Sequence, residues 1–324
     1  MSMELSPIVG VSRAMKRASK LVERFAPSAL PILLVGATGT GKELFARHIH
    51  RLSRRRGPLV DVNCGALPQE IAESLLFGHR RGAFTGAVES VVGHLERADR
   101  GTLFLDEVLH LSVPAQVKLL RALETGEVQP LGAGLKLPVD FRVVSAAQED
   151  TPERLHRGLF RHDLFQRLAG VVIDLPVLSD RPEDIMPLAR HFATLQRQTL
   201  AAGSEEVLES HSWPGNVREL RLAIERAACL VKNGTLPPDA LRRAIALGMP
   251  KDRRSPRRQS SEGRRASDRH ANVSPDVKHQ LAVFESHGRD ARRAAAELQI
   301  SLSTFYARLK RAGLSVRAVR NGQN

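Results

Sequence analysis

The stretch PILLVGATGTGKELFARHIHRL, residues 31–52, decides the fold of this chain. PILLV is a short apolar run that predicts a buried strand at residues 31–35, and the residues from Lys42 onward have helical periodicity. Between them, GATGTGK at residues 36–42 matches the spacing G-x-x-x-x-G-K of a phosphate-binding loop. Its glycines let backbone N–H groups converge on phosphate oxygens, and the helix N-terminus and Lys42 add positive charge. The alternative is an incidental glycine-rich loop, which does not require the strand, the lysine and the helix together.

This loop supplies the first candidate site residues, for which we expect contact with ATP. They are Gly36, Ala37, Thr38, Gly39, Thr40, Gly41, Lys42 and Glu43. A Ser or Thr that contacts Mg²⁺ commonly follows the lysine, whereas this chain has Glu43. We therefore expect another carboxylate to carry more of the metal binding.

The segment GTLFLDE, residues 101–107, provides that carboxylate at the end of a second apolar strand. Asp106 is the candidate ligand of Mg²⁺, and Glu107 is the candidate catalytic residue that polarises the attacking water. Two acids that end a strand can also be helix N-cap residues. Together with the phosphate loop, they favour ATP hydrolysis.

The remaining chain predicts an α/β domain followed by helical segments. Further short apolar runs at residues 58–62, 141–146 and 171–175 alternate with helical patterns, which predicts a parallel sheet flanked by helices. Residues 182–247 are expected to contain helices only, with a break at WPGN (213–216). The predicted domains are an α/β core (1–180), a helical lid (181–248), a basic flexible linker (249–273) and an all-α helix-turn-helix domain (274–324).

Composition points to a cytoplasmic protein with a polyanionic partner. The formal net charge is +14, and residues 251–324 hold 17 Lys or Arg against 7 Asp or Glu, which is typical of nucleic-acid binding. A solvated, disordered extension is the alternative. No apolar run is long enough to cross a membrane, no export signal begins the chain, and Cys64 and Cys229 have no metal-binding or redox spacing.

The segment GHRRGAFTGAV, residues 78–88, is ambiguous when taken alone, because GAFTGA can be an ordinary turn with Phe84 in the core. Between the two nucleotide motifs it makes residues 7–247 resemble the AAA+ ATPase domain of bacterial enhancer-binding proteins, the activators of sigma-54 RNA polymerase. The resemblance implies ATP and Mg²⁺ as cofactors and assembly from dimers to a hexameric ring. It also implies that the sigma factor is contacted by Gly82, Ala83, Phe84, Thr85, Gly86 and Ala87.

The same resemblance assigns four further residues. Asn63 in VNC (62–64) is similar to the switch residue that holds the catalytic glutamate. Arg161 and Arg167 in GLFRHDLFQRL (158–168) match arginine fingers that reach the nucleotide of a neighbouring subunit, although either can instead form a surface ion pair. Arg218 in WPGNVREL (213–220) resembles the second sensor, which points from the lid to the phosphates.

Several positions depart from the family's pattern. The phosphate loop usually reads GESGTGKE, so Glu43 is expected, but Ala37 and Thr38 are changes. Gln148 stands at the first sensor in place of the usual Asn, and Arg100 replaces a common glycine. Gln148 and Arg100 do not allow the rate of ATP turnover to be predicted from the sequence. The family commonly has a regulatory domain before the ATPase, and this sequence is expected to lack one.

The C-terminal stretch HGRDARRAAAELQISLSTFYARLKRAGL, residues 287–314, has the pattern of a helix-turn-helix and resembles the Fis-type DNA-binding domain. A helical hairpin used for dimerisation is the alternative. The candidate contacts with double-stranded DNA are Ser301, Ser303, Thr304, Tyr306, Arg308 and Lys310. Gln299 and Leu302 differ from residues common in that domain, which leaves more of the affinity to phosphate contacts.

The leading hypothesis is an ATP-dependent activator that binds DNA upstream of a promoter and remodels sigma-54 RNA polymerase. A DNA-binding regulator whose AAA+ scaffold has lost efficient hydrolysis is the alternative, and an AAA+ remodeller of another substrate is the third. GAFTGA argues against the third.

Overall fold

The computed structural model describes residues 8–148, 151–231 and 234–248. Of the C-terminal part it describes Val283, Phe284, Ala294, Ala295, Glu297, Leu298 and Phe305. The chain divides into two compact units, Met1–Lys251 and Asp252–Asn324.

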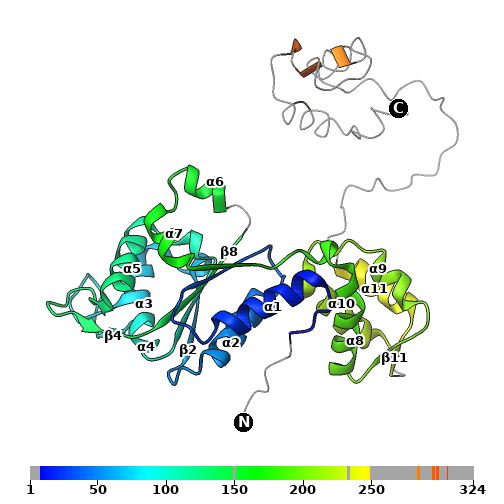
Figure 1. The fold of residues 1–324 in the computed structure, drawn as a ribbon, viewed down its shortest axis with the longest axis horizontal. Coiled ribbons are helices and arrows are strands. Elements are labelled where there is room, and N and C mark those ends of the chain that lie inside the picture. Colours follow the sequence, from blue (N-terminus) through cyan, green and yellow to red (C-terminus); the bar gives the residue numbers. More distant parts are fainter. Residues whose placement is uncertain are drawn as a thin grey trace. The chain divides into compact units, whose positions relative to one another are not determined.

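A parallel five-stranded sheet forms the centre of the first unit (Figure 1), with the strand order β2-β5-β8-β1-β9. The strands are β1 (Ile32–Val35), β2 (Leu59–Asn63), β5 (Thr102–Asp106), β8 (Arg142–Ala147) and β9 (Val171–Asp174). The predicted sheet is confirmed, and each expected strand lies within one residue of its observed bounds. Asn63 pairs with Asp106 and Val35 with Ala147, so the carboxyl ends of these strands lie together at one edge.

Helices cover both faces of this sheet, because apolar side chains alternate between the faces along each strand. Leu33 of β1 packs in a core with residues of α3 (Gln69–Phe77), α5 (Val113–Thr125) and α7 (His162–Leu168). Its neighbours Ile32 and Leu34 pack on the opposite face against α1 (Arg13–Phe25) and α2 (Lys42–Ser53). The shorter elements here are α4 (His94–Arg97), α6 (Thr151–His156), η1 (Cys64–Ala66) and η2 (Val108–His110).

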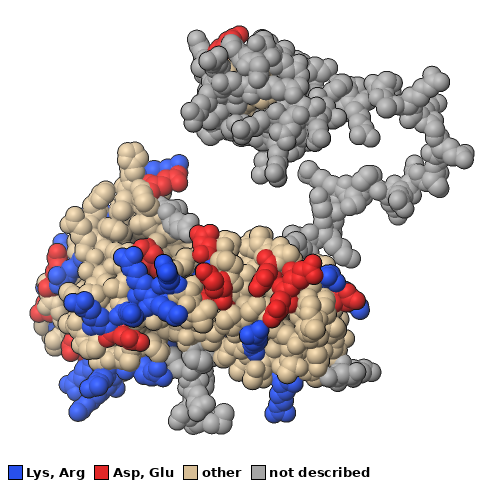
Figure 2. Space-filling view, turned by 45° about the vertical axis from the view of Figure 1, so that its right-hand side comes forward, with Lys and Arg blue, Asp and Glu red and all other residues tan. Residues whose placement is uncertain are grey.

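The lid is a separate cluster around the buried Trp213, Leu220 and Ile224. It contains α8 (Ile185–Leu195), α9 (Ser204–Glu209), α10 (Asn216–Leu230) and α11 (Pro238–Gly248), preceded by η3 (Leu178–Asp180) and η4 (Pro182–Asp184). In Figure 2 the largest acidic group lies over this lid and the largest basic group over the α/β part.

The prediction that residues 182–247 contain helices only was wrong. The two-residue strands β10 (Thr199–Leu200) and β11 (Thr235–Leu236) pair in parallel within the lid. The Ala201 N–H donates to the Leu236 carbonyl at 3.0 Å, and the Ser204 hydroxyl donates to the same carbonyl at 2.9 Å. Strands of two residues are too short to produce a period in the sequence, which is why the pattern missed them.

Two short antiparallel hairpins extend the α/β part. β3 (Gly78–His79) pairs with β4 (Val91–Val92), and β6 (Glu127–Val128) pairs with β7 (Leu137–Pro138). The hairpins touch, since His79 forms a bridge with Leu131 and the Arg80 N–H donates to the Leu131 carbonyl at 2.9 Å. Within the described ranges, the helices are all too short or too polar to cross a bilayer.

In the second unit, Phe284 and Phe305 are buried with their ring centroids 5.6 Å apart. Ala294 and Ala295 are also buried, and the Leu298 N–H donates to the Ala294 carbonyl at 3.1 Å, as in a helix. The predicted linker 249–273 and all six candidate DNA contacts, Ser301, Ser303, Thr304, Tyr306, Arg308 and Lys310, lie outside the described residues.

Candidate functional site

The phosphate loop runs from the end of β1 to the start of α2. The Gly36 N–H donates to the Ala147 carbonyl at 3.2 Å, which fixes the loop to the sheet. Gly39 and Gly41 have φ values of 82° and 111°, in the left-handed region that favours glycine. A Cβ on Gly41 would meet nothing within 4 Å, so the space above this residue is open. Thr38 and Glu43 are exposed at the rim of the loop.

The ammonium group of Lys42 folds back on the loop that precedes it. Its Nζ donates to the Gly36 carbonyl at 2.7 Å and to the Ala37 carbonyl at 3.1 Å. The buried Thr40 hydroxyl donates to the same Ala37 carbonyl at 2.9 Å. The loop therefore already has the curved form that a phosphate group requires.

The carboxylates of Asp106 and Glu107 lie at the end of β5. The half-buried Asp106 carboxylate accepts a hydrogen bond from the Glu107 N–H at 3.0 Å. Glu107 has a φ of 52°, a left-handed conformation that is uncommon outside glycine. The carboxylate of Glu107 lies against Gly65, where a Cβ would force it to move.

Burial and neighbouring negative charges disfavour ionisation of Asp106 and Asp61. Burial is the main cause that raises the pKa of Asp106, and Glu107 and Glu43 raise it further while Lys42 lowers it. The pKa of Asp61 on β2 is raised by burial and by Glu43 and Asp106. A cation at this edge of the sheet would relieve both effects.

The oxygen ligands suit Mg²⁺, which is usually held by one or two carboxylates together with phosphate oxygens and water. Among the described residues, His, Cys, Asp and Glu form no group of three or more arranged to hold a metal by themselves. The carboxylate of Asp106 is of the kind that a magnesium site with phosphate oxygens and water requires.

Asn63 lies on β2 next to Asp106 in the sheet register. Its Oδ1 accepts a hydrogen bond from the Ala66 N–H at 3.0 Å and so caps η1. The family resemblance implies that Asn63 holds Glu107, and among the described residues these two side chains form no hydrogen bond. Both side chains nevertheless lie against Gly65, at the same edge of the sheet.

The lid contacts the phosphate loop through the carbonyls of three successive residues. Asn216 Nδ2 donates to the Thr38 carbonyl at 3.0 Å. The Arg218 N–H donates to the Gly39 carbonyl at 3.3 Å. Arg181 donates to the Thr40 carbonyl at 3.2 Å. The lid and the nucleotide loop are therefore joined directly, and the backbone of Arg218 lies beside the loop.

Asn216 and Arg181 were not found by the sequence analysis. Asn216 is buried with a φ of 54°, and its Oδ1 accepts from the Leu178 N–H at 2.7 Å. Arg181 is fully buried 3.8 Å from Asp184, which also accepts hydrogen bonds from Ser12. No local sequence pattern marks either residue, because both act through contacts that are distant along the chain.

The two candidate arginine fingers are exposed, Arg161 as the N-cap residue of α7 and Arg167 within that helix. Arg161 forms a two-pronged contact with Asp163, at 3.0 Å and 2.6 Å, which raises the pKa of Arg161. Arg167 donates to the Leu123 carbonyl at 2.8 Å. Buried Gln116 positions the start of this helix by accepting from the Arg161 N–H at 2.9 Å.

Gln148 directly follows β8 and is half-buried. Its carbonyl accepts from the Thr151 hydroxyl at 2.7 Å. Arg100 has a φ of 56°, which explains why glycine is common at this position in the family. Its carbonyl accepts from the Gly57 N–H at 2.8 Å, so the turn is held despite the side chain.

GAFTGA forms the exposed tip of the β3–β4 hairpin. Phe84 is 44% exposed, with its ring centroid 5.0 Å from that of His79, and Thr85 is exposed. The Gly82 N–H donates to the Ala87 carbonyl at 2.9 Å, which closes the loop, and Ala87 alone of its six residues is buried. A Cβ on Gly132 would lie 2.8 Å from that of Ala83, so the β6–β7 hairpin braces the loop. The reading of Phe84 as a core residue does not fit this geometry.

Comparisons with known proteins agree with this arrangement. Residues 8–174 match the sigma-54 interaction domain, and residues 179–258 match the AAA+ ATPase lid domain. The sigma54-dependent transcriptional regulator SfnR of Pseudomonas fluorescens is 46% identical over 229 residues, which is 68% of this chain and 62% of SfnR. The C4-dicarboxylate transport transcriptional regulatory protein DctD of Rhizobium meliloti is 38% identical over 317 residues, which is 95% of this chain and 65% of DctD.

The chain thus spans less than two thirds of the length of these two relatives. Among solved structures, NtrX from Brucella abortus in complex with ATP is similar, with a TM-score of 0.68 and 30% identity over 95% of this chain and 70% of NtrX. The family match covers more than half of the chain and includes the phosphate loop, the GAFTGA hairpin and the acidic strand end. The chain belongs to the sigma-54 interaction family of AAA+ ATPases.

Proposed function

We propose that this protein is a transcriptional activator that hydrolyses ATP to remodel sigma-54 RNA polymerase and open a promoter. It assembles from dimers into a hexameric ring in the cytoplasm. Residues 274–324 bind double-stranded DNA upstream of the promoter through the candidate contacts named above. The observation that carries this proposal is the exposed GAFTGA tip on the domain that also holds the nucleotide site.

In this proposal, the phosphate loop binds the β- and γ-phosphates of ATP. The glycine backbone at Gly39 and Gly41 approaches the phosphates, and Lys42 exchanges its bonds to Gly36 and Ala37 for bonds to phosphate oxygens. Asp106 holds Mg²⁺, which neutralises charge that develops on the phosphates when it is bound. Glu107 orients and polarises the attacking water.

Gln148 and Arg218 complete the site from β8 and the lid. The exposed Arg161 and Arg167 act on the nucleotide of the neighbouring subunit, which makes hydrolysis depend on ring assembly. Arg161 would then exchange its contact with Asp163 for the phosphate. An arginine supplied in this way is typically worth about 10³–10⁵ in rate.

Asn63 transmits the state of the nucleotide. In the structure it caps η1, and a rotation would bring its amide to Glu107 across Gly65. η1 leads into α3, and α3 ends at Phe77, directly before Gly78, where the GAFTGA hairpin begins. A movement of Asn63 can therefore be passed along the chain through η1 and α3 to Phe84 and Thr85.

The decisive experiment compares native protein with Thr85→Ala in ATP hydrolysis and in transcription from a sigma-54 promoter. We expect the variant to hydrolyse ATP at the native rate and to fail to open the promoter. Glu89→Ala, an exposed residue of the same hairpin outside GAFTGA, is the matched control and is expected to activate normally. Normal activation by Thr85→Ala would show that the assigned contact is wrong.

ATP turnover itself is tested with Asp106→Ala as the inactive control. Native turnover no higher than this control at any protein concentration would favour the regulator that lacks efficient hydrolysis. The finger role is tested by mixing Arg161→Ala with Asp106→Ala. Because an interface can then combine one intact half from each, the mixture should recover part of the turnover that both variants lack alone.

A further inference from the structure

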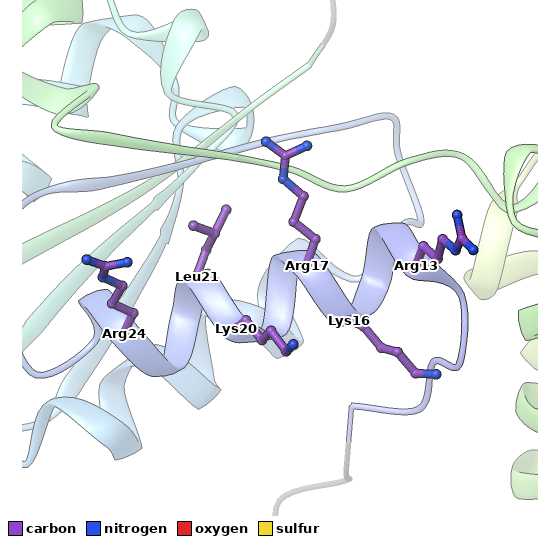
Figure 3. A pocket seen from close by; sticks show the side chains of 6 residues that line it. All are labelled: Arg13, Lys16, Arg17, Lys20, Leu21 and Arg24. Carbon is purple, nitrogen blue, oxygen red and sulfur yellow. The ribbon is translucent and has the colours of Figure 1, made fainter.

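The first helix, α1 (Arg13–Phe25), has two opposite faces. Met15, Ala18 and Val22 are buried against the sheet. The exposed side carries five cations, which we call the basic face: Arg13, Lys16, Arg17, Lys20 and Arg24. Ala14 and one acidic residue, Glu23, are the other exposed residues of this helix. In Figure 3 these side chains stand along the whole length of the helix, with Arg17 and Arg24 above its axis and Lys16 and Lys20 below it.

This arrangement is unfavourable for an isolated helix. Arg13 and Arg17, Lys16 and Lys20, and Lys20 and Arg24 are like-charge pairs at a spacing of four residues, which repel each other. The first turn has no acidic residue to match the positive helix N-terminus. None of the basic-face residues forms an ion pair with any residue in the ranges 8–148, 151–231 and 234–248. A negatively charged partner would remove these costs.

The shape of the basic face suits a linear polyanion. Its side chains and the half-buried Leu21 line a shallow pocket of about 480 Å³. From Arg13 to Arg24 the helix rises by roughly 16 Å. Measured along the axis of a DNA duplex, this length corresponds to about five phosphates of one strand. A single small anion would engage only two or three of these cations.

We propose that the basic face of α1 binds the phosphate backbone of double-stranded DNA independently of sequence. A protein partner is less well matched, because interface cores are enriched in aromatic residues, whereas no aromatic side chain lines the pocket and Leu21 is its single apolar residue. The choice of DNA as the polyanion rests on the DNA binding proposed for residues 274–324. The ATPase domain then holds DNA that its own chain has captured.

The test is the triple variant Lys16→Gln, Arg17→Gln, Lys20→Gln in the full chain, with a fluorescent 30-base-pair duplex of arbitrary sequence. We expect at least about tenfold weaker binding at 0.1 M salt, because each lost phosphate contact reduces counterion release. The slope of log K against log salt should fall in magnitude by up to about 2.7 for three contacts. The matched control, Arg121→Gln, Arg197→Gln, Arg243→Gln, removes the same charge from exposed positions elsewhere and should stay within about twofold of native binding.

Circular dichroism and ATP binding check that both triple variants are folded. If the basic-face variant binds the duplex with native affinity and native salt slope, the proposal is overturned. Loss of activation with unchanged DNA binding also overturns it, since the face would then serve a protein. Failure of the native chain to bind any duplex instead refutes the DNA binding proposed above and removes the reason for choosing DNA.

Discussion

Replacement of Asn216 by alanine tests how the lid positions the phosphate loop. The change removes the acceptor of the Leu178 N–H at 2.7 Å and the donor to the Thr38 carbonyl at 3.0 Å. The two losses are unequal. Leu178 is fully buried, so its N–H is left without a partner, whereas Thr38 is exposed and its carbonyl can bind water.

The buried N–H should cost about 1–3 kcal/mol and the carbonyl about 0.5–1.5 kcal/mol. Alanine at a φ of 54° adds strain, because asparagine tolerates the left-handed region better. We therefore expect the free energy of unfolding to fall by about 2–4 kcal/mol. This corresponds to roughly 5–15 °C in Tm for a unit of this size. ATP binding should weaken as well, because the loop loses its contact at Thr38.

Urea unfolding and an ATP titration of the same samples measure both effects. Asn216→Asp is the control, since aspartate keeps the acceptor for Leu178 and tolerates the backbone conformation but places a carboxylate against the Thr38 carbonyl. It should be more stable than Asn216→Ala and yet bind ATP at least as weakly. Equal stability of the two variants, or a loss below about 1 kcal/mol for alanine, would refute this account of the contact.

Three further predictions concern single residues. Arg100→Gly should raise the free energy of unfolding by about 0.5–1 kcal/mol in urea, because glycine relieves the left-handed φ of 56° at an exposed side chain. A thiol reagent should modify one cysteine in the native protein and two after denaturation, because Cys229 is exposed whereas Cys64 is buried and burial strongly raises its pKa; two reactive thiols before unfolding would contradict the burial of Cys64. Asp106→Asn should raise the Tm of the nucleotide-free protein at neutral pH, since the raised pKa of Asp106 means that its ionised form destabilises the fold. Below the ordinary carboxyl pKa, Asp106 is protonated in both the folded and the unfolded protein, and it costs no stability. The cost grows as pH rises through the raised pKa of Asp106, which is the reverse of the usual acid effect. The gain in Tm from Asp106→Asn should therefore disappear at low pH.

Much of this fold could be predicted because its signals are local. The apolar run before Gly36 and the helical pattern after Lys42 identify β1, the phosphate loop and α2, and the helical pattern of residues 182–247 identifies the lid. The short strands β10 and β11 escaped prediction because two residues show no period, and tertiary contacts decide whether they pair.

The site could be predicted only in part, for a related reason. Asp106 and Glu107 end an apolar strand and are visible in the sequence. Asn216 and Arg181 act on carbonyls that lie 178 and 141 residues away along the chain. No local pattern specifies contacts of this range, and the left-handed φ of Arg100 is likewise a property of the folded turn.

The hold of the lid on the phosphate loop has a consequence for how the loop tolerates sequence change. Asn216, Arg218 and Arg181 all donate to main-chain carbonyls, so they recognise the path of the backbone and ignore the identity of the side chains. Ala37 and Thr38 can therefore differ from the usual Glu and Ser without releasing the lid. Gly39 has no such freedom, since a Cβ there would lie 2.4 Å from the Gly215 carbonyl. Within one short loop, interchangeable and irreplaceable positions thus stand side by side.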